Sequence, residues 1–205
     1  MSEILEIRDR AQPATDDART STLTIDVPTW ADELAAAAGP LDSDDARMKL
    51  AIGLARRNVD TGGSPFGAAV FHEDRLLAVG VNCVLSSGFS IAHGEIVALM
   101  RAEKAAGRRA LPGTLPLTLV TSTEPCCQCF GALVWAGVTR LVCGATTEDA
   151  EAIGFDEGPK PDGWAAVLER RGIAVTLAVR RDEAAEVLCA YQRTGGAIYG
   201  GPRST

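Results

Sequence analysis

The chain has little of what a membrane-embedded, exported or nucleic-acid-binding protein needs. Its 205 residues contain no long hydrophobic run, and stretches such as Leu34–Ala38 and Gly67–Phe71 are far too short to cross a bilayer. The start, MSEILEIRDR, lacks the basic region and apolar core of a signal peptide. Lys and Arg number 20 against 27 Asp and Glu, and the net charge of −7 opposes binding to phosphate backbones. We therefore expect a cytoplasmic protein with no membrane partner, and nucleic acid is disfavoured.

Histidine is also scarce, whereas cysteine is not. The chain has two histidines and six cysteines, three of which crowd into Cys126-Cys127-Gln128-Cys129. Because 46% of the residues are hydrophobic, the chain can bury a real core and needs no disulfides to stabilise it. In a chain without an export signal, cysteines this close together indicate metal binding or catalysis.

Patterned segments begin near residue 41. Residues 1–40 are rich in Asp, Thr, Ala and Pro, so we interpret them as a loosely ordered extension or surface strap ahead of one domain, residues 41–205. Hydrophobic periodicity and turn residues predict the element order α-β-β-α-β-α-β-α-β-α. Strands are expected at 66–71, 76–81, 115–121, 140–144 and 173–179; helices are expected at about 43–57, 92–106, from 125 onward, 164–171 and 182–193.

This element order predicts the fold class. Strands that alternate with helices pair in parallel through right-handed crossovers. We therefore predict an α/β fold, a three-layer α/β/α sandwich on a five-stranded mixed sheet. A full helix separates the fourth and fifth strands, so these last two strands should be parallel.

Candidate metal ligands lie at the starts of two predicted helices. His93 belongs to His93-Gly94-Glu95, and Cys126 and Cys129 follow Pro125, a good first residue for a helix. Positions three apart on a helix place both sulfurs on one face, where they can hold one ion. Two thiolates and one imidazole suit Zn²⁺ and leave a fourth tetrahedral position for water, as in catalytic sites.

Glu95 is the predicted proton carrier. Zinc lowers the pKa of a bound water from about 15.7 toward about 7, and a neighbouring carboxylate can pass the proton to a substrate nitrogen and then to a leaving amine. The alternative is a structural zinc knuckle, but such sites usually have four protein ligands, and His72 has no ligand-like spacing. Cys127 points about 100° away from its neighbours on a helix, which favours a packed thiol over a substitute ligand.

These residues form the known H-x-E…P-C-x-x-C signature of zinc deaminases. Over residues 41–199 the chain resembles the cytidine-deaminase-like zinc hydrolases, and within them most resembles bacterial guanine deaminases. Besides the zinc motifs, the resemblance rests on residues 65–70, Asn82, Trp135 within residues 131–137, residues 151–159 and Ile198-Tyr199. It implies a zinc enzyme whose partner is a small purine base, converting guanine to xanthine and ammonia.

The resemblance also implies roles for polar groups around the base. Glu95 would carry the proton to N3 of guanine, with C2 facing the zinc hydroxide. Glu157 would hold the exocyclic amine and the N1–H side as a second catalytic carboxylate. Asn82 and the backbone N–H of Gly94 would contact the purine. Glycine at 94 replaces the alanine usual in guanine deaminases and is expected to leave more room beside the metal.

Apolar groups would close the site. The resemblance implies a wall made by Phe66, Trp135 and Phe155, and a C-terminal tail whose Tyr199 reaches an active site, often that of the partner subunit. A homodimer is the expected assembly, with exchange of this tail between subunits as an option.

Other functions stay open. A tRNA adenosine deaminase uses the same chemistry but needs a phosphate-binding surface, which the net charge of −7 and the acidic last helix disfavour. A relative could deaminate another amino-heterocycle such as cytosine, guanosine, a pterin or an aminotriazine. A non-catalytic, zinc-stabilised binding domain is the third alternative, against which the intact Glu95 argues.

Overall fold

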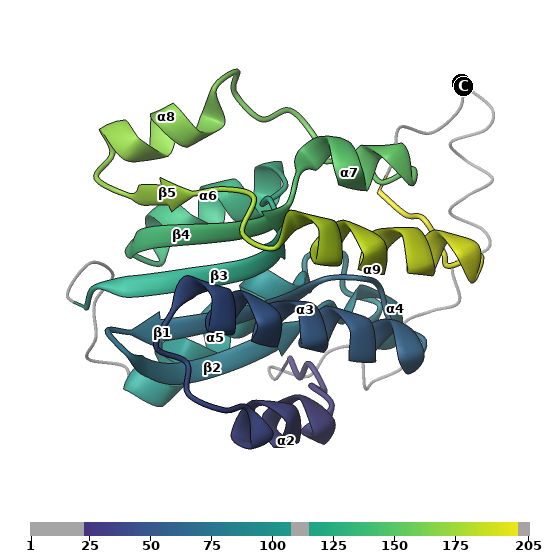
Figure 1. Ribbon diagram of the computed structural model, residues 1–205, viewed down its shortest axis with the longest axis horizontal. Coiled ribbons are helices and arrows are strands. Elements are labelled where there is room, and N and C mark those ends of the chain that lie inside the picture. The colour runs from purple at the N-terminus through teal and green to yellow at the C-terminus, as the bar shows by residue number, and fades with distance from the viewer. Residues whose placement is uncertain (1–22, 108–114, 201–205) are drawn as a thin grey trace.

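A five-stranded mixed sheet lies at the centre of the molecule (Figure 1). The structure is a computed structural model that describes residues 23–107 and 115–200. The strands are β1 (Gly67–His72), β2 (Arg75–Val81), β3 (Leu117–Thr123), β4 (Val138–Ala145) and β5 (Ala174–Thr176). Their order is β2-β1-β3-β4-β5; β1 is antiparallel to β2 and β3, whereas β3, β4 and β5 run parallel. The predicted parallel pairing of the last two strands is confirmed.

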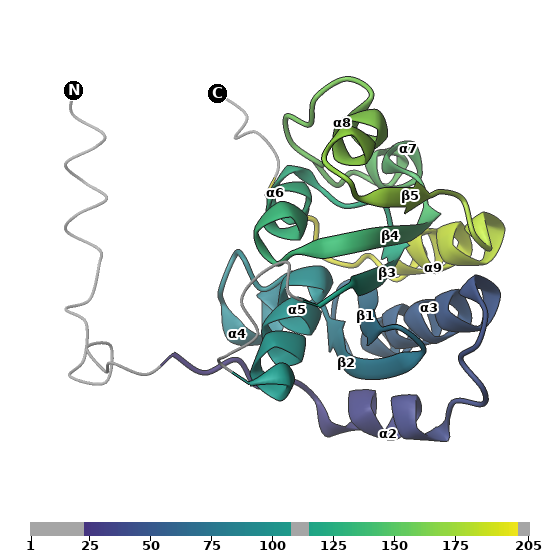
Figure 2. The ribbon, with the colours of Figure 1, turned by 90° about the vertical axis from the view of Figure 1, so that its left-hand side faces the viewer.

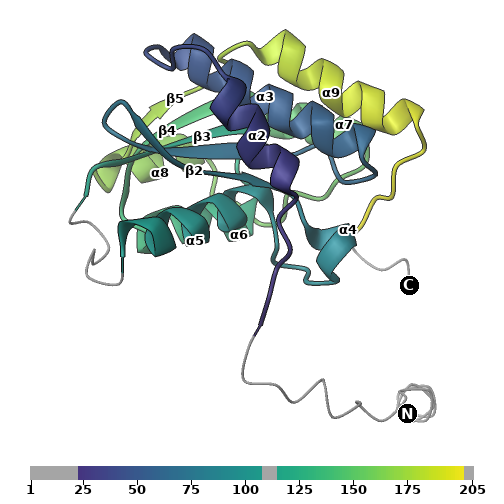
Figure 3. The ribbon, with the colours of Figure 1, turned by 90° about the horizontal axis from the view of Figure 1, so that it is seen from below.

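Helices cover both faces of this sheet. They are α2 (Thr29–Ala37), α3 (Asp44–Asp60), α4 (Val84–Ser87), α5 (Gly94–Ala106), α6 (Cys127–Trp135), α7 (Thr147–Ala152), α8 (Trp164–Arg170) and α9 (Arg181–Arg193). Figure 3 shows α3 and α9 on one side of the sheet and α5 and α6 on the other. The predicted three-layer α/β/α sandwich is therefore confirmed. None of the described helices combines the length and the apolar character needed to span a membrane.

The alternation of side chains along each strand builds two separate cores. In β1, Phe71 packs with the α3 layer, whereas Val70 packs with the α5 layer. In β3, Val120 and Leu119 divide between the same two layers. Successive residues of a strand point to opposite faces, so a central strand covered on both faces contributes side chains to a core on each side. Packing on both faces therefore fixes the position of each helical layer relative to the sheet.

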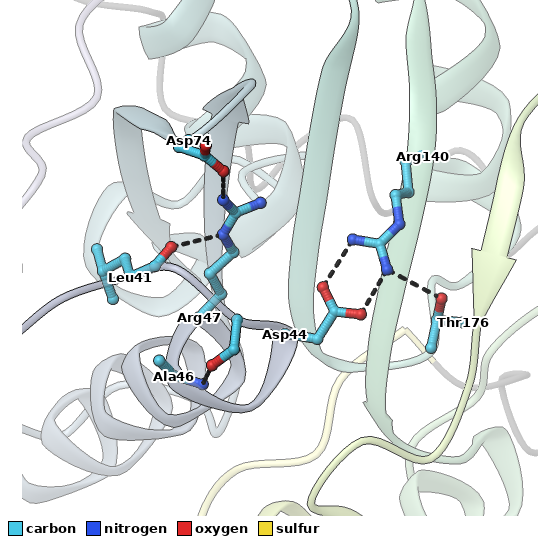
Figure 4. Close-up of polar contacts among 8 residues, drawn as sticks. Leu41, Asp44, Ala46, Arg47, Asp74, Arg140 and Thr176 are labelled. Carbon is cyan, nitrogen blue, oxygen red and sulfur yellow. Dashed lines mark hydrogen bonds and ion pairs between the residues drawn. The ribbon is translucent and has the colours of Figure 1, made fainter.

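Local capping and ion pairs fix the start of α3 (Figure 4). The Ser43 hydroxyl accepts a hydrogen bond from the Ala46 N–H at 3.2 Å, which satisfies a free donor of the first turn. Asp44 accepts a bidentate hydrogen bond from Arg140 of β4, and this pairing lowers the pKa of Asp44. The half-buried pair therefore ties the helix to the sheet.

Some elements differ from the sequence-based expectation. Helices α4 and α7 fall between the predicted elements, and β5 has 3 residues rather than the expected 173–179. Helix α2 lies within the expected extension and packs against α3 and β2, with Ala31 fully buried. Residues 1–22 lie outside the described residues, so the predicted boundary at residue 41 stays a prediction.

Candidate active site

The N-termini of α5 and α6 bring the predicted metal ligands together. His93 caps α5 and Cys126 caps α6, one turn before Cys129. Cys126 Sγ lies 3.4 Å and Cys129 Sγ 3.6 Å from His93 Nδ1, and all the ligand atoms lie within 4.8 Å of one another. Tetrahedral Zn²⁺ with ordinary Zn–S and Zn–N bonds places such atoms about 3.6 Å apart. The donor set therefore fits zinc.

The electrostatics of this cluster also suit a cation. A hydrogen bond from Cys129 lowers the pKa of the Cys126 thiol to about 4, against the opposing effect of burial. The same hydrogen bond and burial hold the pKa of Cys129 well above its usual value. Burial likewise raises the pKa of Glu95, which is only 7% exposed. A bound cation stabilises both sulfurs as thiolates, because metal ligation deprotonates coordinating thiols.

A cavity of about 330 Å³ opens over the cluster. Of the predicted site residues, it is lined by His93, Cys126, Glu95, Glu157, Asn82, Phe66, Phe155 and Tyr199. Cys129 lies just beneath and is fully buried. The carboxylate of Glu95 therefore lines the same cavity as the metal ligands, as a proton carrier requires.

The loop after α7 delivers the second carboxylate. The Cys127 N–H donates to the Glu157 carbonyl at 2.9 Å, which ties this loop to the start of α6. Glu157 is 5% exposed, and its Oε2 is buried without a hydrogen-bond partner within the described residues. Burial, followed by the nearby Cys126 thiolate, raises the pKa of Glu157 to about 8. An unpaired buried carboxyl oxygen is costly unless a ligand pairs with it.

Cys127 packs instead of joining the metal ligands. Gly158 has φ +68°, and a Cβ placed there would lie 2.5 Å from Cys127 Sγ. The thiol thus occupies the space left by a glycine whose backbone conformation most residues avoid. Among the described residues, the cluster that could hold a metal contains His93, Cys126 and Cys129 without Cys127.

Asn82 and Tyr199 meet at one wall of the cavity. Asn82 Oδ1 accepts a hydrogen bond from Tyr199 Oη at 2.9 Å and another from the Val84 N–H at 3.0 Å. Tyr199 Oη also lies 2.9 Å from Ser64 Oγ. The tail residue Tyr199 therefore reaches the cavity of its own chain in this structure.

Phe66, Phe155 and Tyr199 form the aromatic part of the wall. The Phe66 and Phe155 rings are 4.9 Å apart at 70°, and Phe155 and Tyr199 are 5.7 Å apart at 77°, both edge-to-face. Trp135 does not join them. It ends α6, about 13 Å along the helix from Cys126, and is 79% exposed.

The environment of Gly94 differs from the expectation of extra room beside the metal. A Cβ at this position would point at the Phe66 carbonyl oxygen, 3.2 Å away, and the Asn82 backbone nitrogen, 3.5 Å away. A methyl group at Gly94 would therefore point at the backbone of the neighbouring strand ends. Its absence lets α5 pack closely there and adds no space beside the metal ligands.

Sequence reasoning missed two separate sets of polar contacts at the site, around Glu124 and around Asn58. Glu124 is 8% exposed, lines the cavity and accepts hydrogen bonds from the Thr147 N–H at 3.1 Å and hydroxyl at 2.7 Å. Lys160 donates to the same hydroxyl. Asn58 joins two backbone segments by donating to the Ser64 and Asn82 carbonyls at 2.8 and 3.0 Å. Only the position of Glu124, directly before Pro125 of the zinc motif, gave a signal.

The fold and this site place the protein among zinc-dependent hydrolases, because three protein ligands leave a coordination position beside a buried glutamate. Residues 41–145 match the family model of the cytidine and deoxycytidylate deaminase zinc-binding region, and the chain belongs to this family. It is a zinc-dependent nucleobase deaminase, and zinc is its cofactor.

Similarity to individual proteins extends beyond the zinc motifs. The chain is 37% identical over 111 residues to guanine deaminase of Bacillus subtilis (strain 168), covering 54% of this chain and 69% of that protein. It is 30% identical over 145 residues to a tRNA-specific adenosine deaminase of Buchnera aphidicola subsp. Schizaphis graminum, covering 71% and 91%. The solved structure of guanine deaminase from Nitrosomonas europaea superposes with a TM-score of 0.78 at 40% identity, covering 85% of this chain and 98% of that one.

Proposed function

We propose that this enzyme hydrolyses free guanine to xanthine and ammonia. The observation that carries the proposal is the pair of buried carboxyl groups, Glu95 and Glu157, that line one cavity with the metal ligands. Guanine presents an amidine carbon, C2. The N–H groups on either side of it can donate hydrogen bonds to a second carboxyl group. Similarity to the guanine deaminases supports the same substrate.

Glu95 moves the protons in this proposal. Zinc held by His93, Cys126 and Cys129 would supply the positive charge that lets water act as a nucleophile at neutral pH. Glu95 takes a proton from the water that attacks C2 and passes it to N3. It then delivers a proton to the exocyclic amine, so that the C2–N bond breaks and ammonia leaves. Glu95 lines the same cavity as His93 and Cys126, which places its carboxylate beside the attacking water in this proposal.

The other residues hold the base. The unpaired Oε2 of Glu157 would accept from the exocyclic amine and N1–H side. The amide nitrogen of Asn82 and the backbone N–H of Gly94 would donate to the purine, and Phe66 and Phe155 would pack on the ring. Holding C2 beside the attacking water removes the entropic cost of bringing the reactants together.

The direct test is ammonia release by the zinc-loaded protein from guanine, guanosine, cytosine, adenine, a pterin, an aminotriazine and an anticodon-loop RNA. We expect guanine to give the highest kcat/KM. The Glu95→Gln variant should keep zinc and lose turnover by at least about 10³-fold, while Glu103→Gln, on the exposed face of the same helix, should remain active. Preference for the RNA would instead favour a tRNA deaminase, and zinc without ammonia from any compound would favour a binding domain.

We further propose that the enzyme is a homodimer that acts in the cytoplasm. Figure 2 shows α4, α5 and α6 on one side of the sheet. Large apolar side chains of α5 and α6 are exposed, among them Met100 at 53% and Trp135 at 79%. Large apolar side chains exposed to this extent are typical of protein interfaces. All six cysteines are free thiols, which fits a reducing compartment.

A further inference from the structure

The Tyr199 hydroxyl is held between one group that can only accept a hydrogen bond and one that can also donate. Asn82 Oδ1 and Ser64 Oγ each lie 2.9 Å from Tyr199 Oη. A phenol has a single proton, and an amide oxygen has none. The Tyr199 proton therefore points at Asn82, and the Ser64 hydroxyl donates to Tyr199. The hydrogen bonds run in one direction, from Ser64 to Tyr199 to Asn82.

This chain of hydrogen bonds fixes which end of the Asn82 amide faces the cavity. Val84 N–H also donates to Oδ1, at 3.0 Å, so both acceptor positions of the amide oxygen are filled by the protein. A flipped amide would turn its N–H groups against the Val84 N–H and lose that bond, and the Tyr199 hydroxyl would then have to reverse and donate to Ser64. Within the described residues, Nδ2 has no partner and remains the amide group available to a ligand.

We propose that Tyr199 is a positioning residue that selects the substrate through Asn82. Its hydroxyl locks the amide so that the site offers a donor to the base, and a base with an acceptor nitrogen at that edge is preferred over one with an N–H there. The role differs from a wall contact, because it depends on the hydroxyl rather than on the ring. It rests on the proposed function, since guanine supplies ring-nitrogen acceptors.

The surroundings hold every member of this chain in place. Ser64 is fully buried, and Asn58 donates from one amide nitrogen to the carbonyls of Ser64 and Asn82. On the other side, Tyr191 donates to the Ala197 carbonyl at 2.7 Å, which directs the tail after α9 toward the cavity. The Asn82 amide is thus oriented before a ligand arrives, so binding has only a small entropic cost for ordering it.

The test is a binding cycle in a background that cannot turn over guanine. Zinc-loaded Glu95→Gln protein is compared with the same protein carrying Tyr199→Phe, Asn82→Ala or both, and the Kd of guanine is measured by calorimetry. Tyr199→Phe keeps the ring that packs on Phe155, and we expect it to weaken binding about 5- to 10-fold. If Tyr199 acts through Asn82, adding Tyr199→Phe to Asn82→Ala should change the Kd by less than 2-fold.

A further variant separates the donor role from the acceptor role of position 82. Asn82→Asp keeps an oxygen for Tyr199 but replaces the donor with an acceptor, so it should bind guanine no better than Asn82→Ala. Independent, multiplicative losses in the double variant, or native affinity in N82D, would overturn the positioning role. If guanine does not bind the Glu95→Gln protein at all, the guanine assignment fails instead, and the cycle is run with the base that the ammonia panel identifies.

If Tyr199 had only a structural role, Tyr199→Phe would lower the thermal midpoint. We expect the thermal midpoint of Tyr199→Phe to stay within about 2 °C of the parent, since the substitution removes one hydrogen bond from a partly buried tail. In the active enzyme, the loss should appear in kcat/KM for guanine while zinc content stays unchanged.

Discussion

At the scale of single residues, two adjacent cysteines have opposite environments. Cys126 caps α6 beside His93 and carries a thiol whose pKa is lowered to about 4. Cys127 packs against Gly158, and burial raises the pKa of its thiol. One step along a helix start is enough to separate a metal ligand from a packing group, because successive side chains point about 100° apart.

These neighbours form a matched pair for testing the metal site. Cys126→Ala should lower zinc stoichiometry well below one per chain and remove activity, since two ligands hold zinc poorly. Cys127→Ala should keep full zinc content and lose only packing, about 1 kcal/mol of unfolding free energy. Zinc measured by mass spectrometry after dialysis checks both. Equal zinc loss in the two variants would mean that Cys127 contributes to the site.

Glu157 provides the second residue-scale prediction. Its buried Oε2 lacks a partner among the described residues, and Gln at this position would replace an acceptor by a donor facing the N–H groups of guanine. Glu157→Gln should therefore lower kcat/KM for guanine by about 10- to 100-fold, the cost of an unpaired buried group. Glu151→Gln, exposed on the same segment, is the control. Unchanged guanine kinetics in Glu157→Gln would remove this residue from the substrate contacts.

At the scale of elements, helix α7 positions the loop that carries Glu157. Thr146 and Asp149 form a reciprocal capping box, with the Thr146 N–H donating to Asp149 at 2.8 Å. Arg181 of α9 donates to both oxygens of Asp149 at 2.9 Å. This pairing lowers the pKa of Asp149 to about 2. The short helix is thus stabilised at its start and attached to α9.

The capping box predicts a pH-dependent loss of stability. Asp149→Ala should cost about 1 kcal/mol of unfolding free energy at pH 7, because it removes the cap and the Arg181 pair. A carboxyl group whose pKa is lowered on folding stabilises above its unfolded value and loses this effect as the pH falls. The difference between wild type and variant should therefore shrink as the pH falls from about 4 to about 2. Urea unfolding across this range measures it, and a constant difference would contradict the carboxylate role.

The C-terminal tail depends on a close backbone approach. A Cβ at Gly196 would lie 2.2 to 2.6 Å from ring atoms of Tyr191, so alanine there must displace the tail or the ring. Gly196→Ala should lower kcat/KM for guanine at least about 5-fold by moving Tyr199 away from Asn82. The thermal midpoint should change little. Gly39→Ala, with open space around it, is the control. Native kinetics in Gly196→Ala would show that the tail position is unimportant for turnover.

Elements with strong local patterns could be predicted from the sequence. The elements that it did not predict depend on tertiary contacts. The helix over Asp44–Asp60 begins at a side-chain cap, and β1 and the first half of β3 contain apolar runs, so both signals lie in the sequence itself. Helix α7 has 6 residues and depends on Arg181 of another element, and β5 pairs over 3 residues only. Elements this short carry too few residues for a periodic pattern.

At the scale of the whole molecule, the same division applies to the site. The metal ligands and Glu95 stand at fixed spacings that the sequence displays. Trp135 was expected in the wall because of its segment, but α6 carries it to the surface. Glu124 and Asn58 form hydrogen bonds with residues far away in the chain, Thr147 and Asn82. These contacts exist only in the folded molecule and leave no pattern in the sequence.

The exposed position of Trp135 leads to the prediction at this scale. Trp135 on α6 and Met100 on α5 are both exposed on the face of the sheet opposite α3 and α9, where a second copy is proposed to pack. Placing a carboxylate at either position would bury charge without a partner in such an interface, which costs several kcal/mol. Met100→Glu and Trp135→Glu should therefore shift the protein from dimer to monomer in sedimentation velocity, without unfolding it. Leu177→Glu, 44% exposed beyond β5, should leave the dimer intact. A monomeric wild type, or dimers that persist in both variants, would show that this face does not form a homodimer interface.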